Sequence, residues 1–387
     1  MRGIAILWVV LHHVAQVSPP SAPPGLILGT LYRSLLAGWL GVDVFFVLSG
    51  YLITGILLDA RGDGAHAPRG YFRSFYARRA LRILPLYYLF VIAMLLLHPG
   101  TPSGHGTWWY WLFLPNWLFA VYGWPVAIPG TGHIWSLAIE EQFYLVWPAL
   151  VAWLRPRQLW VVSLALIVAA PLLRVALLRH DNVIAAYLLT PSRADALAFG
   201  ACAALLVRDH GRRFVPLARV AALVSLAAVI ALLLGDHLQT PFGRLALVGG
   251  SDFVALLTAS CIYLAVLDNR LRWLANPILV SLGTYSYAIY LVQIPLRSAL
   301  VVPWVGTHIQ GDVPKLIANF VGLLALSWTL AWIIRQLIEK PALSLKRFVP
   351  MPTPANQNAP ASSAITGAAP AAICAASAPT GGSNRVT

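Results

Sequence analysis

Long apolar runs, each about the length of a bilayer-spanning helix, dominate this sequence of 387 residues. A transmembrane α-helix needs roughly 20 mainly apolar residues, and a window of that length marks about ten such runs. They lie near residues 3–18, 35–58, 83–98, 134–154, 158–178, 185–207, 217–235, 245–267, 274–296 and 316–338. Only 10% of the residues are charged, against roughly 25% in an average soluble chain. The sequence therefore predicts an all-α polytopic membrane protein with about ten transmembrane helices.

A further apolar run near 108–122 is short and aromatic, so we expect a re-entrant or interfacial segment there and not a crossing. With that count, most of the 27 Lys and Arg residues fall on one side of the membrane. The positive-inside rule assigns that side to the cytosol. It predicts a multi-pass protein of the inner (plasma) membrane with both termini cytosolic. The formal charge of +14 suits anionic membrane lipids, and no nucleic acid is needed to explain it.

Two regions divide the chain. Residues 1–349 form the predicted integral-membrane domain, and residues 350–387 are rich in Ala and Pro and are expected to be a disordered cytosolic tail. We expect no appended soluble catalytic domain, so any chemistry is expected in or beside the membrane. The cysteines Cys202, Cys261 and Cys374 lack metal-ligand spacing and are expected to serve packing, and no metal is expected. The first run is barely long enough to span, which predicts a natural start upstream of Met1.

Arg2 and His13 are the polar residues of the first apolar run that share one helix face. Eleven residues separate them in the sequence, which on an α-helix leaves about 20° between their directions and about 16 Å along the axis. His12 points about 100° away. An imidazole exchanges protons near neutral pH, so His13 is a candidate general base. The alternative is a histidine that only hydrogen-bonds to a neighbouring helix.

Glu140 and Glu141 lie in GHIWSLAIEEQFYLVWP, a run otherwise apolar enough to cross a bilayer. A charged group at that depth in a bilayer costs free energy, so such groups mark functional sites. Helical spacing places Glu140 on one face with His133, with Ser136 or Leu137, and with Tyr144, while Glu141 is rotated by about 100°. A carboxylate beside His13 would hold its tautomer. The alternative is a structural ion pair with an intramembrane arginine.

Three more ionisable residues lie at a similar predicted depth, namely Asp43 in GVDVFFVLSGYLI and Arg193 and Asp195 in TPSRADALAFG. They are candidates for the site because intramembrane charges are functional by default. Pairing of Arg193 and Asp195 with Asp43 or Glu140 would instead lock helices together.

Arginines also gather just before the third run, in SFYARRALRILPLYY. Arg78, Arg79 and Arg82 stand at positions i, i+1 and i+4, and such a fork can bind phosphate oxygens bidentately. A positive-inside anchor is the equally common alternative for a run of this kind.

In this order the motifs resemble those of the acyltransferase-3 superfamily of integral-membrane acyltransferases. The resemblance covers residues 2 to about 347 and rests on RGIAILWVVLHH, GVDVFFVLSGYLI, FYARRALRILPLYY, HIWSLAIEEQFYLVWP, TPSRADALAFG, SYAIYLVQIP and EKPALSL. The family's required arginine and histidine of the first span map onto Arg2 and His13. Its paired arginines map onto Arg79 and Arg82, and its more regular glutamate maps onto Glu140.

The resemblance implies transfer of an acyl group, usually acetyl, from acyl-CoA to a hydroxyl of a carbohydrate or lipid-linked glycan. Arg79, Arg82 and Arg78 would bind the donor's phosphates, with Arg2 fixing its helix or the donor. His13 would deprotonate the acceptor, oriented by Glu140 or Asp43. Substrate-binding side chains are expected in and around the aromatic outer loop and in the TPSRADALAFG motif, at Asn116, His133, Trp135, Arg193 and Asp195.

One position departs from the family pattern, because Gln293 stands where many members have a histidine. We therefore expect no proton-transfer role for Gln293, although its amide could bind a sugar hydroxyl. The principal alternative function is a transporter or flippase for a glycan or acyl compound, in which buried charges relay protons. No inverted repeat supports that alternative, and a purely structural membrane protein would leave the intramembrane charges without a purpose.

Overall fold

The computed structural model describes residues 1–21, 25–62, 67–99 and 105–350, and in these residues every regular element is helical. The all-α prediction is thereby confirmed. The predicted tail from residue 351 onwards, with Cys374, lies outside the described residues. The helices are α1 Arg2–Val17, α2 Leu26–Leu36, α3 Gly41–Arg61, α4 Tyr71–Leu97, α5 Trp108–Trp111, α6 Pro115–Tyr122, α7 Trp135–Trp153, α8 Pro156–Arg179, α9 Val183–Leu188, α10 Thr190–His210, α11 Val215–Leu234, α12 Ser251–Leu267, α13 Pro277–Leu296, α14 Val302–His308, α15 Asp312–Ile334 and α16 Lys340–Ser344.

A helix occupies each of the ten predicted apolar runs, but not all ten helices have the composition of a membrane span. Within the described residues, seven helical stretches are long and apolar enough to cross a membrane, and they include α3, α4, α8, α11, α12, α13 and α15. α1 has only 16 residues. α7, which carries Glu140 and Glu141, and α10, which carries Arg193 and Asp195, are not among these seven stretches. The multi-pass architecture is therefore confirmed, and the count of ten remains a prediction.

The run near 108–122 forms two short helices, α5 and α6, of 4 and 8 residues. At about 1.5 Å per residue, neither is long enough to cross a bilayer. This agrees with the prediction that the run is not a crossing. α6 packs on α7 and α9.

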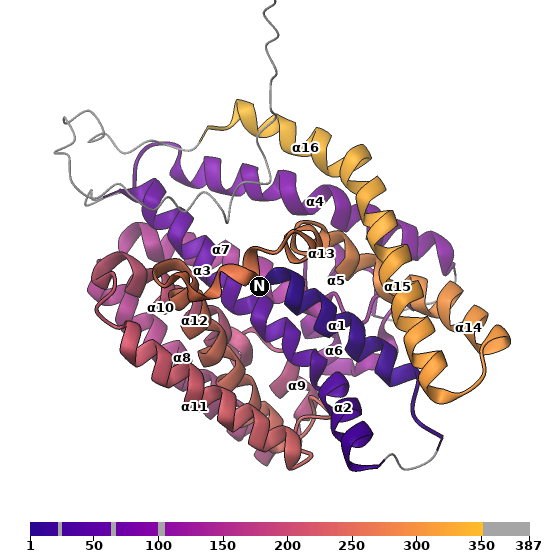
Figure 1. Cartoon of the computed structure of the whole chain (residues 1–387). Coiled ribbons are helices and arrows are strands. Elements are labelled where there is room, and N and C mark those ends of the chain that lie inside the picture. The colour runs from indigo at the N-terminus through magenta and orange to yellow at the C-terminus, as the bar shows by residue number, and fades with distance from the viewer. Residues whose placement is uncertain (22–24, 63–66, 100–104, 351–387) are drawn as a thin grey trace, which may run out of the picture.

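α1 and α3 lie at the centre of the bundle. α13 and α15 pack on one side of α1, and α10, α12 and α7 pack around α3 (Figure 1). α8 and α11 lie at the periphery, where α11 packs on α12. Burial follows this order, since 67% of the most apolar stretch of Ile27–Arg61 is buried against 11% of that of Val215–Leu234.

Glycines set the distance between the central helices. A Cβ on Gly50 of α3 would lie 1.9 Å from the carbonyl oxygen of Leu197 on α10, and one on Gly200 of α10 would lie 2.0 Å from that of Val47 on α3. Small residues at such contacts let two backbones approach closely, as is typical of helix pairs in membranes. The contact between α3 and α10 therefore depends on residues without a side chain.

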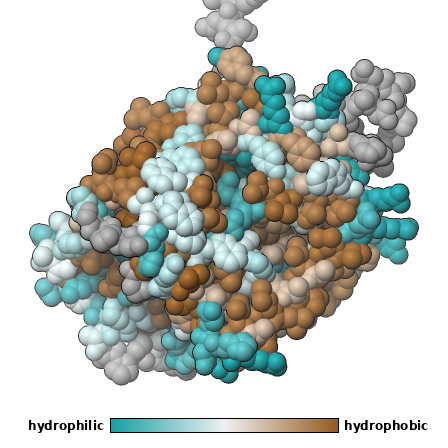
Figure 2. Space-filling view, turned by 180° about the vertical axis from the view of Figure 1, so that it is seen from behind, coloured by the Kyte–Doolittle hydropathy of each residue, from teal (hydrophilic) through white to brown (hydrophobic). Residues whose placement is uncertain are grey.

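The outer surface has the apolar character that a lipid-facing protein needs. Large apolar side chains on the peripheral helices are more than 60% exposed, among them Val161, Leu172 and Leu223. Figure 2 shows one face on which broad hydrophobic areas flank a hydrophilic recess near the middle. Apolar surface of this extent marks a membrane interface in a protein with several spanning helices.

Candidate active site

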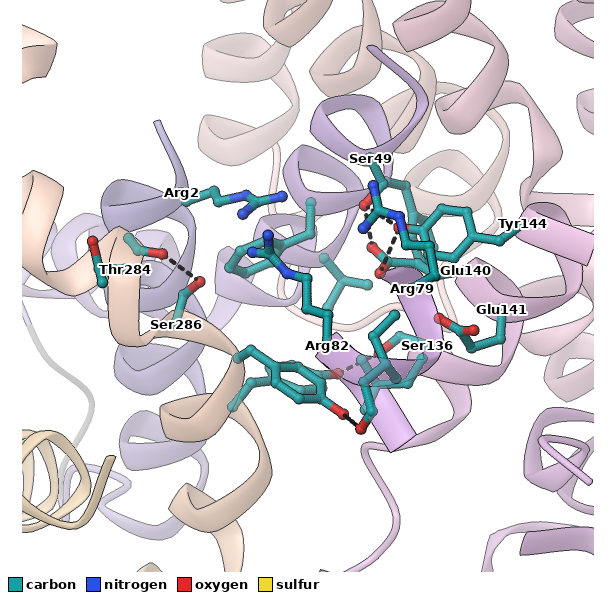
Figure 3. Close-up of a pocket in the computed structure, with 18 residues that line it drawn as sticks. Arg2, Ser49, Arg79, Arg82, Ser136, Glu140, Glu141, Tyr144, Thr284 and Ser286 are labelled. Carbon is teal, nitrogen blue, oxygen red and sulfur yellow. Dashed lines mark hydrogen bonds between the residues drawn. The ribbon is translucent and has the colours of Figure 1, made fainter. Parts of the chain in front are cut away.

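A polar cavity lies between five helices, α1, α3, α4, α7 and α13 (Figure 3). Its charged lining consists of three arginines and two glutamates, which are Arg2, Arg79, Arg82, Glu140 and Glu141. Sequence reasoning identified four of these five as site residues. Their convergence is notable because they come from three helices that lie far apart in the sequence.

The arginines reach the cavity from two helices. Arg2 is the first residue of α1, and Arg79 and Arg82 lie in the third turn of α4 and just after it. Arg79 stacks over the Tyr144 ring with its central guanidinium carbon 5.0 Å from the ring centroid. Three guanidinium groups facing two carboxylates leave the cavity with an excess of positive charge, which favours an anionic ligand.

Glu140 is held in a defined orientation. The Ser49 hydroxyl lies 2.7 Å from one of its oxygens, and the Tyr144 hydroxyl lies 3.2 Å from the other. The hydroxyl oxygens of Ser49 and Tyr144 are also 2.9 Å apart. The interactions join α3 and α7 because Ser49 and Glu140 come from different helices. Ser49 was not singled out from the sequence, where an isolated serine in an apolar run carries no distinctive signal.

Tyr290 of α13 forms another part of the cavity wall. Its hydroxyl lies 2.6 Å from the Ser136 hydroxyl and donates to the His133 carbonyl at 2.9 Å. The rings of His133 and Tyr290 are 5.1 Å apart between centroids. Ser136 and Glu140 thus face the cavity as the helical spacing predicted, while His133 lies against Tyr290 and does not line the cavity.

His13 also lies outside the cavity lining. Its Nδ1 is 3.3 Å from Oε1 of Gln293 on α13, and its backbone carbonyl accepts a hydrogen bond of 2.8 Å from Arg297. The expected carboxylate partner is therefore replaced by an amide. Glu140 bonds to Ser49 instead, and Asp43 forms an ion pair with Arg193.

His12 points away from His13's partners, as its position on the helix predicted. Its Nδ1 lies 2.6 Å from the Leu36 carbonyl, and its Nε2 lies 3.1 Å from Nε2 of Gln16. Both ring nitrogens are thus used in contacts within the protein. The two adjacent histidines have different surroundings, and the His13 ring contacts α13 through Gln293.

Arg78 lies apart from its two neighbours. Its guanidinium donates to the backbone carbonyls of Lys346 and Val349, at 3.4 and 3.1 Å. These bonds connect α4 to the segment after α16, and Arg78 does not line the cavity. Its expected role in donor binding stays a prediction with less support than those of Arg79 and Arg82.

Asp43, Arg193 and Asp195 form buried ion pairs between helices. Asp43 of α3 pairs with Arg193 of α10. Asp195 pairs with Arg174 of α8 at 2.7 Å, and Arg174 also pairs with Asp252 of α12 at 2.8 Å. None of the three predicted residues lines the cavity. This arrangement supports the alternative that they lock helices together, and their role in substrate binding remains a prediction.

Arg174 was missed from the sequence. It lies within an apolar run, PLLRVALL, and its side chain is fully buried. An arginine in the middle of a predicted span was the available signal.

Asn116 and Trp135 also lie outside the cavity lining. The Asn116 amide donates to the Leu188 carbonyl at 3.2 Å and to the Thr190 hydroxyl at 3.1 Å. Trp135 packs against Phe46 and Tyr187. These contacts connect α6 and α7 to neighbouring elements, so the structure gives both residues a packing role, and their contact with substrate remains a prediction.

The described residues include two cysteines and no group of side chains suited to hold a metal ion. Cys202 and Cys261 are free thiols on α10 and α12, and neither lines the cavity. Among the described ranges, no group of three or more His, Cys, Asp or Glu side chains is arranged to hold a metal ion.

The fold and the site define a polytopic membrane protein with a charged cavity between its helices. The chain belongs to the acyltransferase family whose model, described as "Acyltransferase domain", matches residues 1–335. The resemblance seen in the sequence motifs is therefore confirmed. No solved structure matches this chain.

Several curated proteins are similar to this chain. YrhL of Bacillus subtilis is 30% identical over 326 residues, which cover 76% of this chain and 47% of YrhL. The peptidoglycan O-acetyltransferase OatA of Listeria monocytogenes is 29% identical, covering 76% of this chain and 48% of that protein. The O-acetyltransferase OatA of Staphylococcus aureus is 26% identical, covering 88% and 56%. The chain spans about half the length of the curated relatives it matches.

Proposed function

We propose that this protein is a membrane O-acyltransferase that moves a short acyl group, most simply acetyl, from acyl-CoA to a hydroxyl of a carbohydrate or glycoconjugate. The observation that carries the proposal is the cavity, in which Arg2, Arg79 and Arg82 face Glu140 and Glu141 between five helices. Family membership supports the reaction class, and the names of the Listeria and Staphylococcus relatives support an acetyl group and a glycan acceptor.

The arginines are the groups proposed to bind the donor. Coenzyme A carries phosphates, and a planar guanidinium binds phosphate oxygens in a bidentate manner. Arg79 and Arg82 would bind these groups from α4, with Arg2 opposite them on α1. The excess positive charge of the cavity supports an anionic donor.

The proposed base lies further along the bundle. His13 is about 16 Å along α1 from Arg2, and its partner Gln293 follows the cavity residue Tyr290 by three residues, or about 4.5 Å of α13. The pantetheine arm of coenzyme A is long and narrow. It would carry the thioester from the arginines past Tyr290 toward His13, so that phosphates and reacting carbonyl are bound at different depths.

The chemistry needs no covalent enzyme intermediate. His13 takes the proton of the acceptor hydroxyl as the oxygen attacks the thioester carbonyl. The carbon–sulfur bond then breaks, the coenzyme A thiolate leaves with the electron pair, and His13 gives the acceptor's proton to that thiolate. The products are an O-acyl ester and free coenzyme A. Glu140, fixed by Ser49 and Tyr144, supplies a fixed charge beside Arg2 and Arg79.

The proposal is tested with the full chain purified into lipid nanodiscs. The protein is incubated with acetyl-CoA labelled in the acetyl group and with soluble glycan fragments prepared from bacterial peptidoglycan. The expected result is an alkali-labile label on the fragments and an equal amount of free coenzyme A thiol. If no acyl-CoA yields a labelled ester, while proteoliposomes containing the protein move the fragments across the bilayer, the transporter alternative replaces the enzyme.

A further inference from the structure

The two ends of the charged cavity differ in their chemistry. On α7, Tyr144 marks the end at which Arg79 stacks on its ring. Ser136 also lines the cavity and lies eight residues before Tyr144 on the same helix, which is about 12 Å along the axis. α7 therefore leads from an arginine at one end of the cavity to a serine hydroxyl at the other.

α13 shows the same separation. Gly283 lies against Arg2, since a Cβ on this glycine would be 3.3 Å from the Cβ of Arg2. Tyr290 lies seven residues further along α13, or about 10.5 Å, and its hydroxyl is 2.6 Å from that of Ser136 (Figure 3). Positive charge thus lies at one end of the cavity, and a pair of hydroxyl groups lies at the other.

The hydroxyl pair brings more donors than its backbone partner can use. The His133 carbonyl accepts from the Ser136 N–H at 3.5 Å, from the Ser136 hydroxyl at 3.2 Å and from the Tyr290 hydroxyl at 2.9 Å. A carbonyl oxygen has two lone pairs, so three donors compete for two positions. The Tyr290 proton can turn to a bound ligand while both donors of Ser136 still satisfy this buried carbonyl.

The Tyr290 hydroxyl is also held in a defined place. Its side chain is 6% exposed, and the rings of Phe45 and His133 have centroids 6.4 and 5.1 Å from its own. A phenol is a stronger hydrogen-bond donor than an aliphatic alcohol. A donor fixed in a site with little water stabilises a negative charge that develops nearby without reorganisation.

We propose that the Tyr290 hydroxyl is a catalytic group that binds the carbonyl oxygen of the donor thioester, with Ser136 as its positioning residue. The pantetheine arm starts at the phosphates and is longer than the roughly 10 to 12 Å between the two ends of the cavity, so the thioester reaches Tyr290. His13 contacts Gln293, one turn beyond Tyr290 on α13, which brings the proposed base to a similar depth. This inference rests on the acyltransferase function proposed above.

Tyr290 acts in the transfer step through a hydrogen bond and keeps its proton. The acceptor oxygen forms a bond to the thioester carbon, and the electron pair of the C=O double bond moves onto the carbonyl oxygen. The Tyr290 O–H donates to that negatively charged oxygen. The pair then returns to form the ester carbonyl, and the carbon–sulfur bond breaks.

Infrared spectroscopy tests the contact itself, apart from activity. The full chain in nanodiscs is loaded with acetyl-CoA carrying ¹³C at the acetyl carbonyl, without acceptor, and the isotope-edited carbonyl band is recorded. A hydrogen bond to a carbonyl lowers its stretching frequency, so the band should move to higher frequency in Tyr290→Phe. Tyr263→Phe is the matched control, because this tyrosine is also buried and donates to a backbone carbonyl, that of Gly211.

Steady-state rates test the catalytic role in the same variants. Loss of one donor to a developing negative charge typically costs about 100-fold or more in kcat, so Tyr290→Phe should lower kcat by about 100-fold. Its acetyl-CoA KM should change by less than about threefold, as for an interaction made mainly in the transition state. Ser136→Ala leaves the His133 carbonyl to Tyr290 and should lower kcat about tenfold, whereas Tyr263→Phe should stay near wild type.

The outcomes separate this inference from the proposed function. If the wild type transfers acetyl but Tyr290→Phe leaves the carbonyl band and kcat unchanged, the carbonyl site is wrong while the enzyme function stands. A change in only one of the two readouts also overturns the inference, because both depend on one hydrogen bond to the same oxygen. If the wild type neither binds an acyl-CoA nor transfers acetyl to any fragment, the proposed function fails and the carbonyl site fails with it.

Discussion

The guanidinium of Arg79 lies over the ring of Tyr144, with its central carbon 5.0 Å from the ring centroid. The Tyr144 hydroxyl in turn lies 3.2 Å from Glu140. A cation of α4 and a carboxylate of α7 are thus connected through one aromatic side chain. A flat guanidinium stacks on such a ring in a way that an ammonium group does not, so this position is specific for arginine and not only for positive charge.

Replacing Arg79 should impair donor binding. Because a hydrogen bond to a charged group contributes about 1.5–3 kcal/mol, Arg79→Ala should raise the acetyl-CoA KM roughly 10- to 100-fold, and Arg79→Lys should restore only part of the loss. Arg73→Ala, an exposed arginine on the same helix, is the control and should stay near wild type. Equal effects of Arg79→Ala and Arg73→Ala would show that general positive charge, not the cavity, governs donor affinity.

The two adjacent glutamates should differ in importance. Glu140 is fixed by Ser49 and Tyr144, whereas among the described residues no equivalent pair of hydroxyl groups holds Glu141. A fixed charge in a polar site stabilises a reaction without reorganisation, so Glu140→Gln should lower kcat at least tenfold and Glu141→Gln by less than about threefold. Steady-state rates of thiol release measure both. A larger loss in Glu141→Gln would reverse the assignment.

The ion pair between Asp43 and Arg193 should serve stability. Removing one partner of a buried pair leaves an uncompensated charge and typically costs about 3–5 kcal/mol, so Asp43→Asn should lower the thermal midpoint of the detergent-solubilised protein. The double variant Asp43→Leu/Arg193→Met should recover most of the stability because it removes both charges. If the double variant is stable but its acceptor KM is raised, the pair binds substrate as the sequence predicted.

The close contact between α3 and α10 gives a test of the packing. Gly50→Ala places a methyl group 1.9 Å from the Leu197 carbonyl oxygen, so the helices must move apart and stability should fall. Gly55→Ala lies in the same helix with no atom within 4 Å of the new Cβ, and removal of a mid-helix glycine should be neutral or stabilising by up to about 1 kcal/mol. Thermal unfolding of both variants in detergent compares them directly, and similar midpoints would contradict the described contact.

The sequence predicted most of the helices because long apolar runs have few alternatives in a bilayer. It missed α2 and the separation of α9 from α10, where the predicted run 185–207 crosses a break before Pro191. A hydropathy window averages over such a break. It also missed the extent of α4, which begins at Tyr71, twelve residues before the predicted run. The polar first turns of that helix lie against other protein segments and need no apolar composition.

The sequence predicted four of the five charged residues of the cavity, but it did not predict which side chains contact each other. Glu140 was recognised as a charge in apolar surroundings, whereas Arg2, Arg79 and Arg82 were assigned to the site through the family resemblance. The partner of His13 was not predictable, because Gln293 lies 280 residues away and helix rotation decides whether it or a carboxylate faces the imidazole.

His13 is proposed to be the base for acyl transfer, and the adjacent His12 provides its natural control. Acceptor-dependent thiol release from acetyl-CoA should be measured in nanodiscs for wild type, His13→Ala and His12→Gln, each at matched folded concentration. We expect transfer to fall at least 100-fold in His13→Ala, as for a lost general base, and to stay within about threefold of wild type in His12→Gln. Undiminished thiol release in His13→Ala would show that His13 is not the base.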